Sequence, residues 1–90
     1  MNLSKRLEHR TVIVTGGGSG IGKGACLRLS EEGANVVVAD VRASLAVAVA
    51  DEISARGGSA LAVECDVSLE VDVESLVAKT VSEFGSIYGM

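Results

Sequence analysis

Hydrophobic positions along this chain fall into two alternating kinds of segment. Short apolar runs cover residues 10–15, 35–39 and 59–65. Longer stretches, residues 20–32, 43–56 and 68–84, repeat apolar side chains every three or four positions. A continuous apolar run predicts a strand covered on both faces, and the wider spacing predicts an amphipathic helix. Strand followed by helix, three times over, predicts an α/β fold with a parallel sheet and right-handed crossovers.

Glycines and one serine mark the expected helix boundaries. Gly33, Gly57 and Gly85 follow the three helical stretches, in the position where glycine commonly ends a helix. Ser68 is the expected N-cap of the third helix, with acidic residues following it in the first turn. We expect a Rossmann-like sheet with strand order 3-2-1, the first part of a doubly wound fold, whose ligand lies at strand 1 where the strand order switches.

The composition narrows the class of protein. The chain has 90 residues, 48% of them apolar and 22% charged, which is typical of one small globular domain or part of one, here residues 1–90. The net charge of −4 argues against a nucleic-acid-binding surface, which needs a basic face. No run of about 20 apolar residues is present, so no membrane span is expected.

The N-terminus and the cysteines bear on the compartment. The first ten residues carry four charges and no apolar segment, so we do not expect a signal peptide. Cys26 and Cys65 lack the spacing and the companions of a metal site, and are expected to be buried thiols in a reducing, cytoplasmic environment. No metal site is expected.

The most informative stretch is residues 15–22, Thr-Gly-Gly-Gly-Ser-Gly-Ile-Gly, which lies between the first expected strand and the first expected helix. A helix start leaves backbone N–H groups without intrahelical partners and carries about half a positive charge. Glycine lets the backbone approach a phosphate closely. Strand, glycine turn and helix therefore predict a site for a nucleotide pyrophosphate.

Three glycine patterns compete for this stretch. The spacing G-x-G-x-x-G/A fits Gly20, Gly22 and Ala25, but begins several residues after the strand. The pattern Thr-Gly-x-x-x-Gly-x-Gly is matched in full from Thr15 to Gly22.

The third pattern is the ATP- and GTP-binding P-loop. It nearly fits from Gly17 to Lys23, but Gly24 stands where a hydroxyl is needed for Mg²⁺. Residues 36–40 resemble the strand that carries the second acidic motif of such proteins. A P-loop-like nucleotide-binding fragment is therefore the alternative interpretation.

Asp40 favours the dinucleotide. It ends the second expected strand, 18 residues after Gly22, where a carboxylate accepts hydrogen bonds from the adenosine ribose hydroxyls. The same carboxylate repels a 2′-phosphate, which favours NAD over NADP. Arg42 weakens that preference, because a nearby arginine can hold a 2′-phosphate, and Ser19 favours NAD again, because no basic residue stands there.

On these residues the chain resembles the short-chain dehydrogenase/reductase family. The resemblance covers nearly the whole chain and is carried by residues 15–22, 38–40, 65–67 and 83–85. It implies a Rossmann fold and NAD(P)-linked oxidation of alcohols or reduction of carbonyls.

The resemblance also implies roles for individual residues. Gly16, Gly20 and Gly22 would form the pyrophosphate turn, Ile21 would close over the cofactor, and Asp40 would bind the ribose. Asp66, with the backbone of Val67, would hold the adenine edge, although Asp66 alone is also explained as a charge near the start of the third helix. The expected cofactor-binding set is Gly16, Gly18, Ser19, Gly20, Ile21, Gly22, Asp40, Val41, Arg42, Cys65, Asp66 and Val67.

The catalytic part of the family pattern is not in this chain. The resemblance implies a later catalytic serine and a Tyr-x-x-x-Lys pair, whereas the only tyrosine, Tyr88, stands two residues before the last. We expect a cofactor-binding portion that is catalytically incomplete, or a non-catalytic interaction module. The side of strand 1 where a fourth strand would pair is expected to be open, which predicts marginal stability or self-association.

Overall fold

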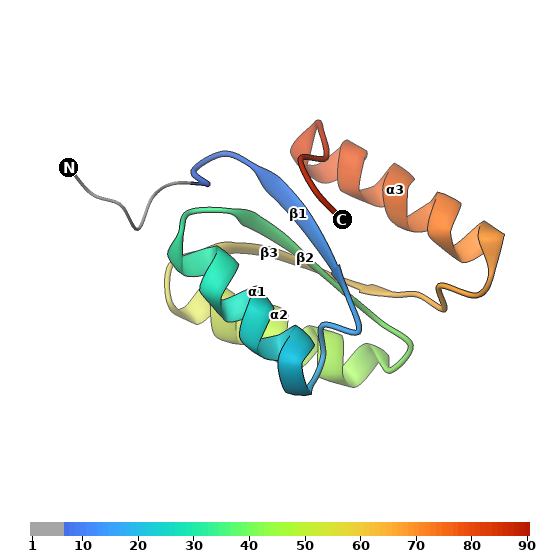
Figure 1. Cartoon of the computed structure of the whole chain (residues 1–90), viewed down its shortest axis with the longest axis horizontal. Helices are drawn as coiled ribbons and strands as arrows, with labels where there is room; N and C mark the ends of the chain where they lie inside the picture. The colour runs from blue at the N-terminus through green and yellow to red at the C-terminus, as the bar shows by residue number, and fades with distance from the viewer. Residues whose placement is uncertain (1–6) are drawn as a thin grey trace.

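A computed structural model describes residues 7–90 and contains three strand–helix units (Figure 1). The elements are β1 (Thr11–Thr15), α1 (Gly20–Glu31), β2 (Asn35–Asp40), α2 (Ala43–Ala55), β3 (Ser59–Glu64) and α3 (Glu70–Phe84). Each boundary lies within two residues of the boundary that the sequence predicts. The alternation of apolar runs and helical spacing was therefore sufficient to place every element.

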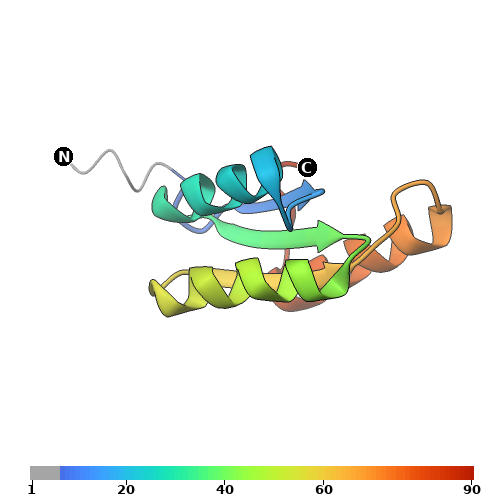
Figure 2. The same ribbon diagram turned by 90° about the horizontal axis from the view of Figure 1, so that it is seen from below.

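The three strands form one parallel sheet in the order β1-β2-β3. The arrows of β1 and β2 point the same way in Figure 2. Val37 of β2 pairs with Ile13 of β1 on one side and with Leu61 of β3 on the other. Five consecutive residues of β2, Val36–Asp40, are buried because this strand has a neighbour on both edges and helices on both faces. The predicted order 3-2-1 and the Rossmann-like fold are confirmed.

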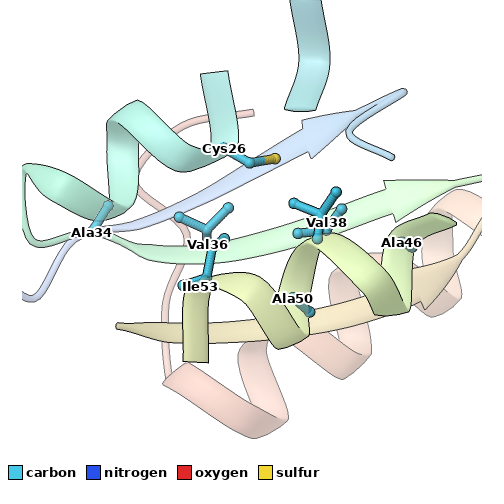
Figure 3. Close-up of a cluster of buried hydrophobic side chains, with 8 residues drawn as sticks. Cys26, Ala34, Val36, Val38, Ala46, Ala50 and Ile53 are labelled. Atoms are coloured by element: carbon cyan, nitrogen blue, oxygen red, sulfur yellow. The ribbon is translucent and has the colours of Figure 1, made fainter. Parts of the chain in front are cut away.

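One face of the sheet is covered by α1 and α2 (Figure 3). Side chains of alternate strand residues point toward these helices, as the two-residue period of a strand requires. The side chains of Val36 and Val38 in β2 face helix residues such as Ile53, and all three side chains are fully buried. The cluster comprises Cys26, Ala34, Val36, Val38, Ala46, Val49, Ala50 and Ile53.

The opposite face is covered by α3 (Figure 1). Leu76 of α3 is fully buried against strand residues of the opposite alternation, Ile13, Val37, Ala39 and Val63. Cys65, directly after β3, completes this second cluster. Phe84 and Ile87 are partly buried at its border.

The free edge of β1 is partly occupied, which corrects the expectation of an open edge. The C-terminal segment runs beside β1: Ile13 donates its N–H to the carbonyl of Gly89 at 2.9 Å, and Tyr88 donates its N–H to the carbonyl of Thr11 at 2.7 Å. The guanidinium of Arg10 lies 4.6 Å from the centre of the Tyr88 ring, which adds a cation–π contact. The expectation was wrong for Thr11–Ile13, because the last residues already hold the position of a fourth strand.

The start of α3 also differs from the prediction. Leu69, and not Ser68, is the N-cap residue, and it makes no side-chain cap hydrogen bond. Ser68 instead donates both its N–H and its hydroxyl to Asp66. The end of α3 is as predicted, since Gly85 adopts a left-handed conformation with φ of 86°. Within residues 7–90, no helix is both long and apolar enough to span a membrane.

Candidate dinucleotide site

The glycine turn lies at the carboxyl end of β1 and leads directly into α1 (Figure 1). Gly16 and Gly20 adopt positive φ angles of 66° and 57°, which residues with a Cβ rarely tolerate. Gly17 donates its N–H to the carbonyl of Ala39 at 3.1 Å, so the turn is tied to the end of β2. The turn thus sits at the rim of the sheet where β1 and β2 both end.

Two further glycines are required by close packing. A Cβ on Gly22 would collide with the backbone carbonyl of Gly16, on the opposite side of the turn. A Cβ on Gly18 would lie 2.7 Å from the Cβ of Leu45 and 2.9 Å from a carboxylate oxygen of Asp40. By contrast, the same atom on Gly24, two residues after Gly22 in α1, would meet nothing within 4 Å. The turn is therefore compact where the sequence pattern places glycine.

The start of α1 presents unpaired donors. Gly20, Ile21 and Gly22 are its first three residues, and their N–H groups have no hydrogen-bond partner among the described residues. Ser19 precedes them in an extended conformation and makes no side-chain cap hydrogen bond. Ile21 is 94% exposed and stands at the rim. These features fit an anionic group at this helix start, because the donors and the helix dipole both favour negative charge.

Asp40 lies beside the turn. Its side chain is buried and accepts two backbone hydrogen bonds, one from Gly18 N–H at 3.0 Å and one from Arg42 N–H at 2.9 Å. The hydrogen bond from Arg42 N–H, and then that from Gly18, hold the pKa of this carboxyl below its ordinary value despite burial. Asp40 therefore remains ionised at neutral pH. Each carboxylate oxygen retains further acceptor capacity.

Arg42 connects the two parts of the site. Its Nε lies 3.7 Å from a carboxylate oxygen of Asp40, and its Nη2 donates a hydrogen bond to the hydroxyl of Ser19 at 3.2 Å. The side chain is 61% exposed, so water screens both contacts. The guanidinium thus spans the distance between the turn and the end of β2. The structure brings together Gly18, Ser19, Asp40 and Arg42, as the sequence predicted.

Asp66 follows β3 and is held in a turn of its own. Its carboxylate accepts hydrogen bonds from the hydroxyl of Ser68 at 2.6 Å and from Ser68 N–H at 2.9 Å, and these lower its pKa. Asp72 accepts the backbone N–H of Asp66 at 3.0 Å and fixes the loop from the first turn of α3. Sequence reasoning assigned Asp72 only to the helix dipole. No local spacing indicates this contact, because the carboxylate bonds the N–H of a residue six positions earlier, before the N-cap.

The remaining predicted residues divide into exposed and buried. Val41 and Val67 are both more than half exposed, and they flank the ends of β2 and β3. The Cys65 thiol points into the core under α3, where burial and then the nearby charge of Asp72 raise its pKa. The backbone of Cys65 is tied to the end of β2, since its N–H donates a hydrogen bond to the carbonyl of Asp40 at 3.0 Å.

Lys23 is directed away from the turn. Its Nζ lies 3.7 Å from a carboxylate oxygen of Glu52 on α2. In a P-loop the lysine reaches the phosphates, and the next residue supplies a hydroxyl. Here the next residue is Gly24. Within residues 7–90, no group of three or more His, Cys, Asp or Glu side chains is arranged to hold a metal ion.

Comparison with known proteins identifies the family of this chain. The sequence model of the short chain dehydrogenase family matches residues 10–90. The chain belongs to the short-chain dehydrogenase family. It is 44% identical over 87 residues to 1,6-dihydroxycyclohexa-2,4-diene-1-carboxylate dehydrogenase of Acinetobacter baylyi, and 39% identical over 82 residues to 7alpha-hydroxysteroid dehydrogenase of Escherichia coli.

Solved structures of this family agree with the fold. A hydroxysteroid dehydrogenase from Escherichia coli superposes with a TM-score of 0.91 at 38% identity, over 97% of this chain and 37% of that one. A 7α-hydroxysteroid dehydrogenase solved with NADH and 7-oxo glycochenodeoxycholic acid gives 0.89 at 38% identity, over 93% of this chain and 33% of that one. The match to the Acinetobacter relative covers 97% of this chain and 33% of the relative's length. The chain thus spans about a third of the relatives that it matches.

Proposed function

We propose that this chain is the cofactor-binding portion of a short-chain oxidoreductase, and that it binds the adenosine and pyrophosphate part of NAD. The pyrophosphate lies at the glycine turn, on the free N–H groups of Gly20, Ile21 and Gly22. The ribose hydroxyls donate to Asp40, and the adenine lies between Val41 and Val67 with Asp66 at its edge. The exposed Ile21 covers the cofactor. In a complete enzyme of this family, the nicotinamide ring of the bound cofactor would supply hydride transfer.

One observation carries this proposal. The buried carboxylate of Asp40 accepts a hydrogen bond from Gly18 N–H, and Gly18 stands two residues before the free N–H groups at the start of α1. In a nucleotide, a phosphate that accepts hydrogen bonds lies next to a ribose whose hydroxyls donate them. The free N–H donors at the start of α1 match the phosphate, and the carboxylate of Asp40 matches the ribose hydroxyls. A family relative has been solved with NADH, which supports the choice of a nicotinamide dinucleotide.

NAD is the preferred form of the cofactor. Asp40 is ionised and buried, so a 2′-phosphate placed beside it meets an uncompensated negative charge. Arg42 lies within reach of such a phosphate, but its guanidinium is already shared between Asp40 and Ser19. We therefore expect NADP to bind more weakly than NAD, by about one order of magnitude.

The substrate class follows from the relatives, which are named as dehydrogenases of a dihydroxycyclohexadiene carboxylate and of hydroxysteroids. An alcohol or carbonyl compound is the corresponding proposal here. The 90-residue chain itself lacks a Tyr-x-x-x-Lys pair, and its one tyrosine packs on Arg10. We propose that it does not transfer hydride alone, because no group in the site can exchange the alcohol proton.

Calorimetric titration of the chain with NAD, NADP, AMP and Mg-ATP tests the proposal. We expect NAD and AMP to bind with similar affinity, because the adenosine half supplies most contacts, and NADP to bind more weakly. Tight binding of ATP that requires Mg²⁺ would contradict this proposal and favour the P-loop alternative. The pairing of Lys23 with Glu52 and the absence of a hydroxyl at Gly24 argue against that outcome.

A further inference from the structure

The buried thiol of Cys26 connects α1 to the glycine turn. Cys26 is fully buried, and its side chain extends from α1 toward the end of β1 (Figure 3). The Sγ lies 3.8 Å from the carbonyl oxygen of Gly17, within the longer reach of a sulfur donor. The thiol therefore donates a weak hydrogen bond from the helix back to the turn that precedes it.

The carbonyl of Gly17 depends on this thiol. Gly17 is buried, and among residues 7–90 no backbone N–H donates to its carbonyl. A buried carbonyl without a donor costs free energy, so the thiol stabilises it although S–H is a weak donor. Packing around Gly17 is tight, because a Cβ there would lie 3.0 Å from the Cys26 Sγ, the Val14 carbonyl oxygen and the Val38 Cγ1. Gly17 is thus held between α1 and the sheet.

Asp40 holds the other end of the same peptide unit. The carbonyl of Gly17 and the N–H of Gly18 belong to one planar peptide unit. That N–H donates to Oδ2 of Asp40 at 3.0 Å, and Gly18 is buried as well. Because the unit is rigid, a rotation that moves the carbonyl away from Cys26 also moves the N–H away from Asp40. Cys26 and Asp40 therefore fix one peptide unit from opposite ends.

The orientation of the Asp40 carboxylate relative to the turn depends on this unit. Its second backbone donor is the N–H of Arg42, which reaches Oδ1 at 2.9 Å. Arg42 lies two residues further along the same segment, so its hydrogen bond fixes the carboxylate only relative to its own loop. The hydrogen bond from Gly18 is the one that ties the carboxylate to the glycine turn.

We propose that Cys26 is a positioning residue for the ribose acceptor Asp40. Its thiol fixes the carbonyl of Gly17, and the attached N–H of Gly18 fixes one carboxylate oxygen of Asp40. The carboxylate is then held beside the turn, in position to accept the hydroxyls of an adenosine ribose. This inference rests on the proposed function, because it takes Asp40 to be the group that accepts those hydroxyls.

Amide hydrogen exchange tests the peptide unit without any ligand. Cys26→Ala removes the donor, and Ile53→Val is the control, because it also removes one heavy atom from the same buried cluster but near the end of α2. We expect Cys26→Ala to speed the exchange of Gly18 N–H about tenfold, because the unit becomes free to rotate. The N–H of Gly17 belongs to the preceding peptide unit and should change by less than about threefold. Ile53→Val should leave the ratio of the two exchange rates unchanged.

Nucleotide binding tests the consequence for the ribose. AMP and 2′-deoxy-AMP differ only in a hydroxyl that Asp40 is proposed to accept, so the ratio of their affinities reports on that hydrogen bond. Calorimetry should show AMP binding about tenfold more tightly to the natural chain and to Ile53→Val. In Cys26→Ala this preference should fall to about threefold. A loss of folded protein lowers both affinities by the same factor, so a purely structural role of Cys26 would leave the ratio unchanged.

Either of two results would overturn the inference. One is exchange of Gly17 and Gly18 N–H that Cys26→Ala speeds equally or not at all. The other is a preference for AMP that Cys26→Ala leaves unchanged or that Ile53→Val lowers as much. If the natural chain binds neither nucleotide, the proposed function fails and the ribose part of this inference fails with it, whereas the exchange rates still decide whether the thiol fixes the peptide unit.

Discussion

The two faces of the sheet differ in how completely they are covered. On one face, two helices enclose a cluster of eight buried residues that includes Val36, Val38 and Ile53. On the other, α3 alone covers a cluster of six, and valines remain exposed beside it. Both faces are built from the same three strands, and alternate residues of β2 are fully buried on each. The difference lies in the number of helices and not in the strands.

The comparison indicates which part of the proposed function lies on the complete face. The glycine turn, Asp40 and Arg42 lie where β1 and β2 meet α1 and α2, at the rim of the complete face. Their geometry depends on contacts such as Gly18 against Leu45, which are all present. On the face under α3, Val77 and Val81 remain exposed beside the buried cluster. The proposed adenosine site is therefore self-contained, whereas the proposed catalytic part is not.

Truncation of one core residue on each face gives the largest expected effect. Ile53→Ala should lower the free energy of unfolding by about 4 kcal/mol, and Leu76→Ala by about 2–3 kcal/mol. The difference arises because α3 has fewer neighbours and can shift to fill the cavity. Urea unfolding of the two variants measures both values. A larger loss for Leu76→Ala would mean that the α3 face is the more rigid one.

Asp40→Asn should be the next largest effect, about 2 kcal/mol at pH 7, because it weakens two hydrogen bonds to a buried carboxylate. The pKa of Asp40 is lowered in the folded state, so its contribution is present above about pH 4 and is lost as the pH falls through the folded pKa. The variant should therefore lose less stability than the natural chain on acidification from pH 4. Asp51→Asn, at an exposed position, is the control and should follow the natural chain. If the stability of Asp40→Asn and that of the natural chain fall by the same amount over this pH range, this role of Asp40 is refuted.

The two cysteines report on the two faces separately. Cys26 lies in the complete face and Cys65 under α3, and both thiols are buried. Burial raises the pKa of Cys26 to about 11, and raises that of Cys65, so neither is reactive until the structure opens. We expect Cys65 to be alkylated about ten times faster than Cys26 in native buffer, because α3 opens locally more easily. Peptide mapping after iodoacetamide treatment measures both rates, and equal rates would imply that the two faces open together.

The smallest effect is expected from Gly24→Ala. Gly24 lies within α1, is exposed and has open space around its Cα. Alanine in a helix interior is more stable than glycine by about 1 kcal/mol. The variant should unfold at a correspondingly higher urea concentration, and a loss of stability would show that α1 needs flexibility at this position.

The sequence was sufficient for the fold and for most of the candidate site. Continuous apolar runs placed β1 and β2, and the spacing of apolar residues placed the helices, because both patterns act locally. The glycine turn and Asp40 could also be predicted. Both follow strands, and the parallel topology brings the ends of neighbouring strands together. The predicted cofactor-binding roles of the glycine turn, Asp40 and Asp66 stay predictions, as does the preference for NAD.

Two predictions were wrong, one because of a contact between distant residues and one because of the path of a loop. The edge of β1 was expected to be open, but Gly89 and Tyr88 pair with it across more than 70 positions of sequence. Ser68 was expected to cap α3, but its hydroxyl bonds Asp66 instead. A serine at this position can bond either the start of the helix or the aspartate before it. Only the path of the loop after β3 decides between the two hydrogen bonds. No local pattern contains that information.

A titration of NAD into the natural chain and two variants tests the central claim, that the glycine turn binds the cofactor through close backbone packing. Gly22→Ala introduces a Cβ that collides with the carbonyl of Gly16, whereas Gly24→Ala makes the same chemical change two residues away in open space. We predict that the natural chain and Gly24→Ala bind NAD equally, and that Gly22→Ala binds at least about tenfold more weakly, a loss of about 1.4 kcal/mol. Equal binding by all three chains would contradict the account.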